Sequence, residues 1–207
     1  MIVNGKKSAG EILAKLKKEM IALAVTPLDR ARRARSSNGV VAKATKKLPR
    51  LTVGAVLVGK NPASISFLKQ KSKTAAVLGV NFKVFKFEQK ITIEKLIKEV
   101  SKLNASRIVS GIIVQLPLPR QINPDRILTA IDPKKDIDAL SEKPVVFSPV
   151  VEAVKFVFEK YKINPKNKNI LIIGRGRLVG QPIYKWLFKD GGRVKIIDER
   201  QKNTLIK

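Results

Sequence analysis

The sequence has neither cysteine nor histidine among its 207 residues. Without cysteine there is no disulfide framework and no thiolate metal site. Without histidine, acid–base chemistry near neutral pH has to use a lysine, a carboxylate, Tyr161 or Tyr184. No apolar run reaches the roughly 18 residues of a membrane span, and the first residues lack the apolar stretch of a secretion signal. We therefore expect a cytoplasmic protein that holds no metal.

Acidic residues are scarce, since 16 Asp and Glu stand against 43 Lys and Arg, for a formal net charge of +27. Such a charge attracts polyanions and can bind nucleic acid non-specifically through its phosphates. Most of the lysines, however, fall on the polar faces of amphipathic helical patterns, where water would solvate them. Aromatic residues make up only 5% of the chain, which leaves few platforms for stacked bases. We favour the interpretation that the lysines lie on solvated helix faces. A third interpretation is that the positive charge binds an anionic small molecule.

What the sequence does contain is a regular alternation of strand and helix patterns. Strands are predicted at residues 51–58, 81–87, 108–116, 168–173 and 193–198, and helices at residues 8–24, 63–78, 93–103, 124–131, 148–161 and 181–189. Ser8 is the expected cap of the first helix, with Glu11 in the capping-box position. The alternation predicts an α/β fold with parallel sheets and crossover helices.

Two domains are expected from this pattern. Residues 1–147 would form a three-layer parallel-sheet domain, within which residues 26–47 read as a basic linker or insertion. Residues 148–207 would form an incomplete Rossmann-like dinucleotide-binding domain. The chain reaches Lys207 just after the second strand of that domain, so we expect either a fragment, a partner that supplies the rest, or a degenerate homologue. We also expect the 207 residues alone to bind NAD(P) poorly.

The string GIIVQLPLP at residues 111–119 combines a strand with its stop signal. An apolar run ends in Gln115, and the prolines that follow provide no backbone donor for further pairing. Ligands of open parallel sheets bind beyond the carboxyl ends of the strands. Gln115 is therefore a candidate wall of a ligand site.

Two more groups of residues can carry chemistry. Lys71 follows Phe67 by one turn of a predicted helix, so the two share a face, whereas Lys73 lies on another. The string KDID at residues 135–138 places two carboxylates on alternating sides of a predicted loop, the second being Asp138. Taken alone, Lys71 and Asp138 equally fit a solvated surface.

The turn after the fourth predicted strand is close to a dinucleotide-binding fingerprint. Its candidate cofactor-binding residues are Gly174, Arg175, Gly176, Arg177 and Gly180. Glycines let the backbone approach a pyrophosphate, which the following helix N-terminus would attract. Asp198 lies where an acid would hold the ribose hydroxyls of NAD, whereas the two arginines suit the 2′-phosphate of NADP. A tight strand–helix turn beside a surface acid is the alternative.

These strings occur in order and at nearly fixed spacing: VGKNPAS at 58–64, F-x-x-x-K at 67–71, GIIVQLPLP at 111–119, KDID at 135–138 and GRGRLVGQP at 174–182. Together they resemble the bifunctional methylenetetrahydrofolate dehydrogenase/methenyltetrahydrofolate cyclohydrolase family. The resemblance covers the chain from Met1 to its end. The string VQLPLP is highly specific to that family, and the glycine turn is much less so.

The resemblance implies a role for each site residue. Lys71 would be the catalytic acid–base group, Gln115 would contact and tune it, and Asp138 would hold the pterin ring. A lysine can serve in this way once burial or a neighbouring charge lowers its affinity for a proton. Residues Phe67, Pro117 and Leu118 would line the substrate site.

The implied activity is a pair of steps in one-carbon metabolism. NAD or NADP would take a hydride from 5,10-methylenetetrahydrofolate, and water would then hydrolyse the methenyl cation to 10-formyltetrahydrofolate. The substrate is a folate, and the family implies a homodimer that needs no metal.

Four departures from the family pattern are present. Phe67 stands for a tyrosine, Gly176 for a serine, Ala139 for a glycine, and residues 148–151 read SPVV in place of T-P-x-G. Two alternatives therefore stay open. One is a cyclohydrolase without the dehydrogenase, or an inactive truncated homologue. The other is a basic protein without enzymatic activity that binds nucleic acid on the same scaffold, through the arginines of residues 30–35 and the lysine faces.

Overall fold

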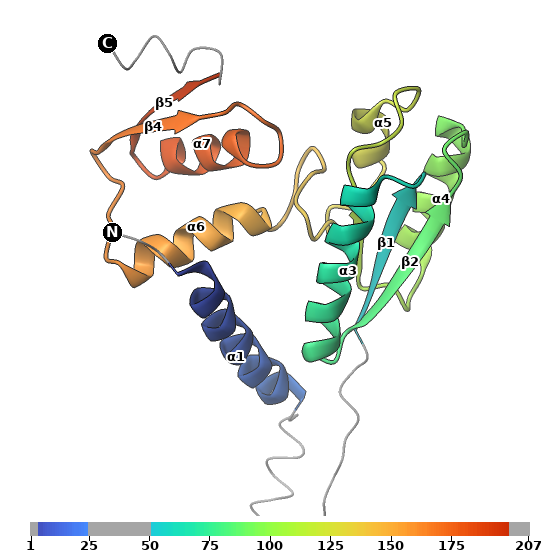
Figure 1. Ribbon diagram of the computed structural model, residues 1–207, viewed down its shortest axis with the longest axis horizontal. Coiled ribbons are helices and arrows are strands. Elements are labelled where there is room, and N and C mark those ends of the chain that lie inside the picture. Colours follow the sequence, from blue (N-terminus) through green and yellow to red (C-terminus); the bar gives the residue numbers. More distant parts are fainter. Residues whose placement is uncertain (1–3, 25–50, 199–207) are drawn as a thin grey trace, which may run out of the picture. The chain divides into compact units, whose positions relative to one another are not determined.

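The computed structural model of the chain describes residues 4–24 and 51–198 (Figure 1). The predicted linker at residues 26–47 lies outside these residues. The chain divides into two compact units. The first unit takes residues 1–91, 105–110 and 114–120, and the second takes residues 92–104, 111–113 and 121–207. The domain boundary expected between residues 147 and 148 stays a prediction.

The first helix, α1 (Gly5–Ala24), begins earlier than expected. Asn4 provides the cap, because its Oδ1 accepts a hydrogen bond from Lys7 N at 3.0 Å. Ser8 instead lies inside the first turns, where its own N–H donates to Asn4 O at 3.1 Å. The predicted cap at Ser8, with Glu11 in the capping box, is therefore wrong. Asparagine caps helices at least as well as serine, so the earlier polar residue takes the position.

The first sheet has three strands in the order β2-β1-β3, so the first strand along the chain is central. β1 (Thr52–Val58) pairs in parallel with β2 (Asn81–Phe87), with Thr52 opposite Asn81 and Val58 opposite Phe87. β1 is buried over nearly its whole length, as its continuous apolar sequence requires. The helix α3 (Pro62–Val77) connects the two strands and packs on both (Figure 1). Such a crossover is what parallel pairing needs.

β3 (Gly111–Val114) is shorter than the strand predicted at residues 108–116, and all four of its residues are buried. The backbone N–H groups of Ser110 and Gln115, just outside it, still donate to carbonyls of β1, at 2.8 Å and 3.0 Å. Pro117 has no N–H to continue this pairing. Gln115 therefore stands directly after the strand, as the sequence predicts. The peptide bond between Leu116 and Pro117 is cis.

Two helices of the second unit begin where the sequence places them. α4 (Ile93–Ala105) buries Leu96, Val100 and Leu103, which follow one another at helical spacing. α5 (Pro124–Leu128) is capped by the Asn123 side chain and ends earlier than the predicted residue 131. The N–H groups of Ala130 and Ile131 donate to carbonyls three residues back, so the chain has left α-helical geometry there.

The second sheet pairs β4 (Asn169–Ile173) with β5 (Arg193–Ile197), again in parallel. The helix α7 (Gly180–Lys189) connects these strands and packs on both, and α6 (Pro149–Lys160) packs on α7 (Figure 1). The ring centroids of Phe158 and Trp186 lie 5.6 Å apart across the two helices. This strand–turn–helix–strand arrangement is Rossmann-like, and the predicted α/β class is confirmed.

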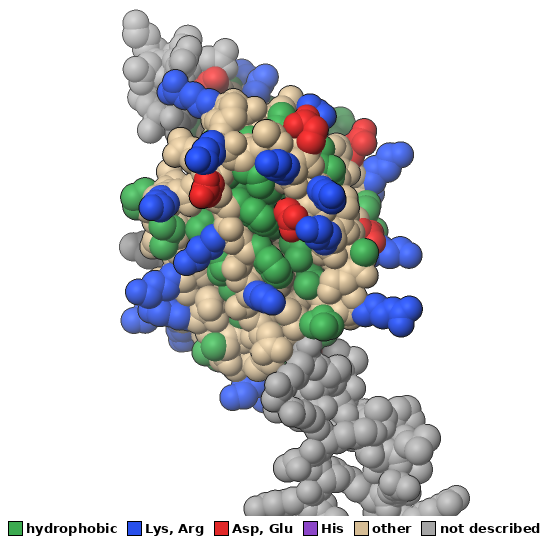
Figure 2. Space-filling view, turned by 90° about the vertical axis from the view of Figure 1, so that its right-hand side faces the viewer, with side chains coloured by type: hydrophobic (Ala, Val, Ile, Leu, Met, Phe, Trp, Pro, Cys, Tyr) green, Lys and Arg blue, Asp and Glu red, His purple; other side chains and the backbone are tan. Residues whose placement is uncertain are grey.

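The positive charge is distributed over the surface. On the face that Figure 2 shows, lysine and arginine side chains are spread around an apolar area, with fewer acidic ones between them. Of the described helices, none combines the length and the apolar character needed to cross a membrane.

Candidate functional site

Lys71 is a half-buried residue in the second half of α3. The start of this helix is fixed by Asn61, whose Oδ1 accepts from Ser64 N at 3.0 Å. Phe67, one turn before Lys71, is 63% exposed. Residues four apart share a helix face, so an accessible aromatic ring lies beside the lysine position.

Gln115 is half-buried, and its two side-chain polar atoms differ in their contacts. Nε2 donates to Leu116 O at 2.7 Å. Oε1 is buried and has no hydrogen-bond partner within the described residues. Burying an oxygen without a hydrogen-bond donor is unfavourable, so this atom is suited to accept a hydrogen bond from an ammonium group or a ligand N–H.

A buried serine connects the segments that carry Lys71 and Gln115. Ser64 is 1% exposed and lies in the first turn of α3, and its Oγ donates to Leu116 O at 3.3 Å. Lys71 and Gln115 therefore belong to two segments of the first unit that this bond holds together. The sequence gives no local signal for Ser64, because its partner lies far along the chain.

Asp138 belongs to the second unit, where it is half-buried in a turn. The preceding carboxyl group, that of Asp136, is only 2% exposed, and its Oδ2 accepts from Ser141 N at 2.6 Å. Ala139 has a φ of 54°, in the left-handed region. Because Lys71 and Gln115 lie in the other unit, the grouping of all three site residues stays a prediction.

The glycine turn between β4 and α7 depends on two of its glycines. Gly174 has a φ of 106°, and a Cβ at Gly180 would collide with Gly174 O. Gly176 differs, because a Cβ there would meet nothing within 4 Å. No side chain caps the start of α7 by a hydrogen bond. The partial positive charge at this end of the helix dipole therefore has no capping partner. The open space at Gly176 and the uncapped helix start together fit a phosphate-bearing cofactor.

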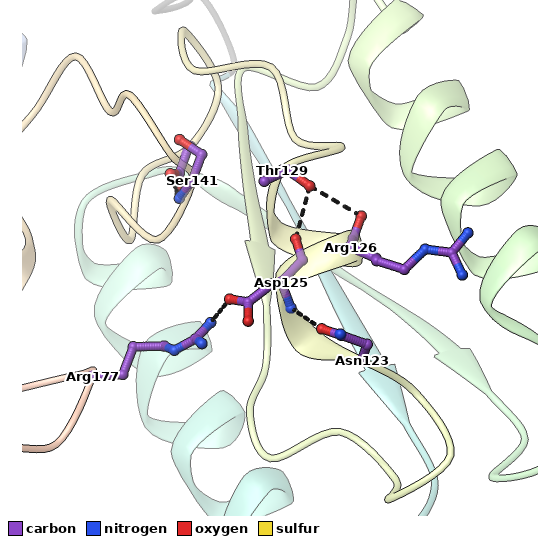
Figure 3. Close-up of polar contacts among 7 residues, drawn as sticks. Asn123, Asp125, Arg126, Thr129, Ser141 and Arg177 are labelled. Carbon is purple, nitrogen blue, oxygen red and sulfur yellow. Dashed lines mark hydrogen bonds and ion pairs between the residues drawn. The ribbon is translucent and has the colours of Figure 1, made fainter.

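The two arginines of the turn have partners within the second unit. Arg177 Nη1 lies 2.6 Å from Asp125 Oδ1, as Figure 3 shows. The hydrogen bond from Arg177 lowers the pKa of Asp125 below its ordinary value. Arg175 Nη2 donates to Ile196 O at 3.2 Å, which lays its guanidinium along the end of β5. Asp198 is exposed and directly follows that strand.

The turn borders a cavity of about 690 Å³. Its lining includes the cations Arg175, Arg177, Lys185 and Lys189, together with the rings of Phe147 and Trp186. A cavity with such a lining suits a negatively charged ligand that has an apolar part. The described residues include no cluster of acidic side chains that could hold a metal ion.

Comparisons with known proteins agree with this arrangement. A family model for the catalytic domain of tetrahydrofolate dehydrogenase/cyclohydrolase matches residues 3–138. The bifunctional protein FolD of Rickettsia canadensis is 35% identical over 212 residues, which cover 98% of this chain and 67% of that protein.

Two solved structures share the fold. The bifunctional enzyme FolD of Campylobacter jejuni, a methylenetetrahydrofolate dehydrogenase/cyclohydrolase, has a TM-score of 0.77 and 27% identity over 94% of this chain and 65% of its own. FolD of Trypanosoma brucei, solved with NADP cofactor and inhibitor, has a TM-score of 0.77 at 24% identity, over 96% of this chain and 64% of its own. The chain thus spans about two thirds of the length of these relatives. On the family match and these identities, the chain belongs to the tetrahydrofolate dehydrogenase/cyclohydrolase family.

Proposed function

We propose that the chain interconverts one-carbon derivatives of tetrahydrofolate. The reactions are the NAD(P)-dependent oxidation of 5,10-methylenetetrahydrofolate to the methenyl cation and the hydrolysis of that cation to 10-formyltetrahydrofolate. Beside the family match, one observation carries this proposal. Gln115 follows β3 with a buried, unpartnered Oε1, on a segment that Ser64 bonds to the helix of Lys71.

In the hydrolysis, water adds to the methenyl carbon, one of the two C–N bonds breaks, and one proton is released. Lys71 takes the proton from the attacking water and returns one to the departing nitrogen. Gln115 Oε1 accepts a hydrogen bond from the lysine, and so orients it without fixing its proton. This role is supported by the unsatisfied state of that oxygen.

The substrate would be held by three kinds of contact. The carboxylate of Asp138 accepts paired hydrogen bonds from the aminopyrimidinone edge of the pterin. The exposed ring of Phe67 stacks on the folate, and Pro117 and Leu118 line the segment after β3. The positive net charge of the chain suits the anionic glutamate tail.

For the oxidation, Gly174, Gly176 and Gly180 would hold the pyrophosphate of NAD or NADP at the start of α7. The nicotinamide would supply the acceptor for the hydride that leaves the methylene bridge. Asp198 would bind the ribose hydroxyls of NAD, whereas the two arginines of the turn would bind the 2′-phosphate of NADP.

Three further statements are part of this proposal. The chain would act as a homodimer, as the family resemblance implies, and in the cytoplasm, as its composition indicates. Hydrolysis alone is the second candidate, because its proposed residues Lys71, Gln115 and Asp138 precede residues 148–207, the expected dinucleotide-binding domain. A protein that binds polyanions is the third candidate, supported by the net charge of +27.

Separate assays of the two reactions test the proposal. Methylene-dependent NAD(P) reduction and loss of the methenyl absorbance would be followed with the same preparation. Hydrolysis is expected at full rate, and NAD(P) reduction is expected at a low rate, because the 207 residues alone should bind NAD(P) poorly. Hydrolysis without reduction would select the second candidate, and the absence of both would contradict the proposed function.

A further inference from the structure

Asp136 is the only acidic or basic side chain that is buried among the described residues. A carboxyl group without water around it is costly unless hydrogen bonds replace the water. Yet Oδ2 has a single donor, the Ser141 N–H at 2.6 Å, and Oδ1 has none within the described residues. The hydrogen bonds of Asp136 therefore do not fully offset the free-energy cost of burying its carboxyl group, which points to a role beyond stability.

The bond from Ser141 to Asp136 closes a turn that contains Asp138. Inside this turn Ala139 adopts a φ of 54°. A left-handed conformation costs a residue with a Cβ about 1–2 kcal/mol and persists only where its surroundings enforce it. The hydrogen bond between Ser141 N and the Asp136 carboxyl group spans this turn and encloses Ala139.

The base of this turn is firmly attached within the second unit. Ile112 N donates to Lys135 O at 2.6 Å, and the Lys135 ammonium donates to the carbonyls of Leu103 and Asn104 at 3.3 Å and 2.7 Å. Ile137 fills the space beside Gly111, where a Cβ would lie 2.6 Å from Ile137 Cγ2. The residues on either side of Asp136 are thus attached to β3 and α4.

We propose that Asp136 is a positioning residue, which fixes the turn of residues 137–141 and thereby aims Asp138 at the pterin edge of the folate. The inference rests on the proposed function, because it takes the pterin contact of Asp138 as given. It adds that the buried carboxyl group acts through the Ser141 amide and has no contact with the substrate.

The first arm of the test needs no folate. Amide hydrogen exchange of Ser141 is measured by NMR in the full chain and in D136A, D136N and the exposed-acid control E142Q. We expect exchange to accelerate about tenfold or more in D136A, which is the loss of about 1.4 kcal/mol. It should change little in D136N, whose amide oxygen can still accept, and in E142Q. Unchanged protection in D136A would overturn the proposal. If D136A does not fold, exchange that accelerates strongly in D136N would overturn it, because the amide oxygen of D136N should keep the bond.

The second arm measures the affinity for 5-formyltetrahydrofolate, a folate that keeps the pterin edge and does not react. D136A should bind about 5- to 30-fold more weakly, the effect of 1–2 kcal/mol, and A139G should recover part of this loss by relaxing the turn. In a D138A background, D136A should cost nothing further. Additive losses would show that Asp136 does not act through Asp138. If neither the parent chain nor any variant binds folate, the proposed function fails. The hydrogen-exchange measurement still decides whether Asp136 fixes the turn.

Discussion

At the scale of single residues, the turn around Ala139 carries a strain that one substitution relieves. Its φ of 54° suits glycine, which is the residue that the family resemblance leads one to expect there. A139G should raise the free energy of unfolding by about 0.5–1 kcal/mol. The gain of about 1–2 kcal/mol from the left-handed position exceeds the 0.4–1 kcal/mol that glycine adds to the entropy of the unfolded chain. Urea unfolding measures the free energy of unfolding of A139G and the parent. A variant less stable than the parent would contradict this account of the turn.

The ion pair between Arg177 and Asp125 makes a pH-dependent prediction. The arginine lowers the pKa of Asp125 in the folded chain, so the pair contributes above the ordinary carboxyl pKa and is lost as the pH falls through the folded value. Both side chains are largely exposed, so the contribution to stability is small. NMR titration should show the pKa of Asp125 rising toward its ordinary value in R177Q. The same pKa in both proteins would show that the pair does not form in solution.

The sequence alone was enough to propose individual site residues, but it did not show which residues contact one another. Gln115 was predictable because an apolar strand before two prolines leaves it at the strand end. Lys71 and Asp138 needed the family resemblance, since each also fits a solvated surface. The Ser64–Leu116 and Asp125–Arg177 contacts had no local signal. They depend on tertiary placement that neither periodicity nor spacing encodes.

At the scale of elements, the turn between β4 and α7 distinguishes structural from binding glycines. G180A should destabilise the protein by roughly 1–3 kcal/mol, because its Cβ would collide with the fixed carbonyl of Gly174. G176A should change the free energy of unfolding by less than about 0.5 kcal/mol, because the space there is open.

A serine at the same position tests the cofactor site. The family resemblance places a serine at residue 176, and a Cβ there would meet nothing within 4 Å. G176S should therefore keep its stability and strengthen NAD(P) binding, measured by calorimetry, because its hydroxyl can donate a hydrogen bond to the pyrophosphate. Equal affinity in G176S and the parent would remove the glycine turn from the proposed site.

Element types followed from the sequence better than element ends did. The strands at β1, β2 and β4 match their predictions within a residue, because runs rich in Val, Ile, Leu or Phe with a glycine nearby mark them. The start of α1 was missed because Asn4 and Ser8 are both competent caps and local sequence does not choose between them. β3 was predicted too long because its flanking residues make sheet-like hydrogen bonds without continuing the strand.

At the scale of the whole molecule, the net charge of +27 and the folate scaffold predict different ligands. A folate that binds the native state at a hundredfold excess over its Kd stabilises it by about 2.7 kcal/mol. For a chain of this length that is a rise in Tm of about 5–10 °C. We expect this rise with 5-formyltetrahydrofolate at physiological salt. A salt-sensitive RNA complex with no response to folate would favour the polyanion-binding candidate instead.

The central claim is that Lys71 performs acid–base chemistry on a folate, and one comparison tests it most directly. Lys73 lies on the same helix, on another face, and is exposed, so K73A removes an equal charge from α3 without touching the proposed site. Methenyl hydrolysis should fall at least about 100-fold in K71A, the ordinary contribution of a general acid–base group. It should stay within about twofold of the parent in K73A. Hydrolysis that survives in K71A, or falls equally in both variants, would contradict the account.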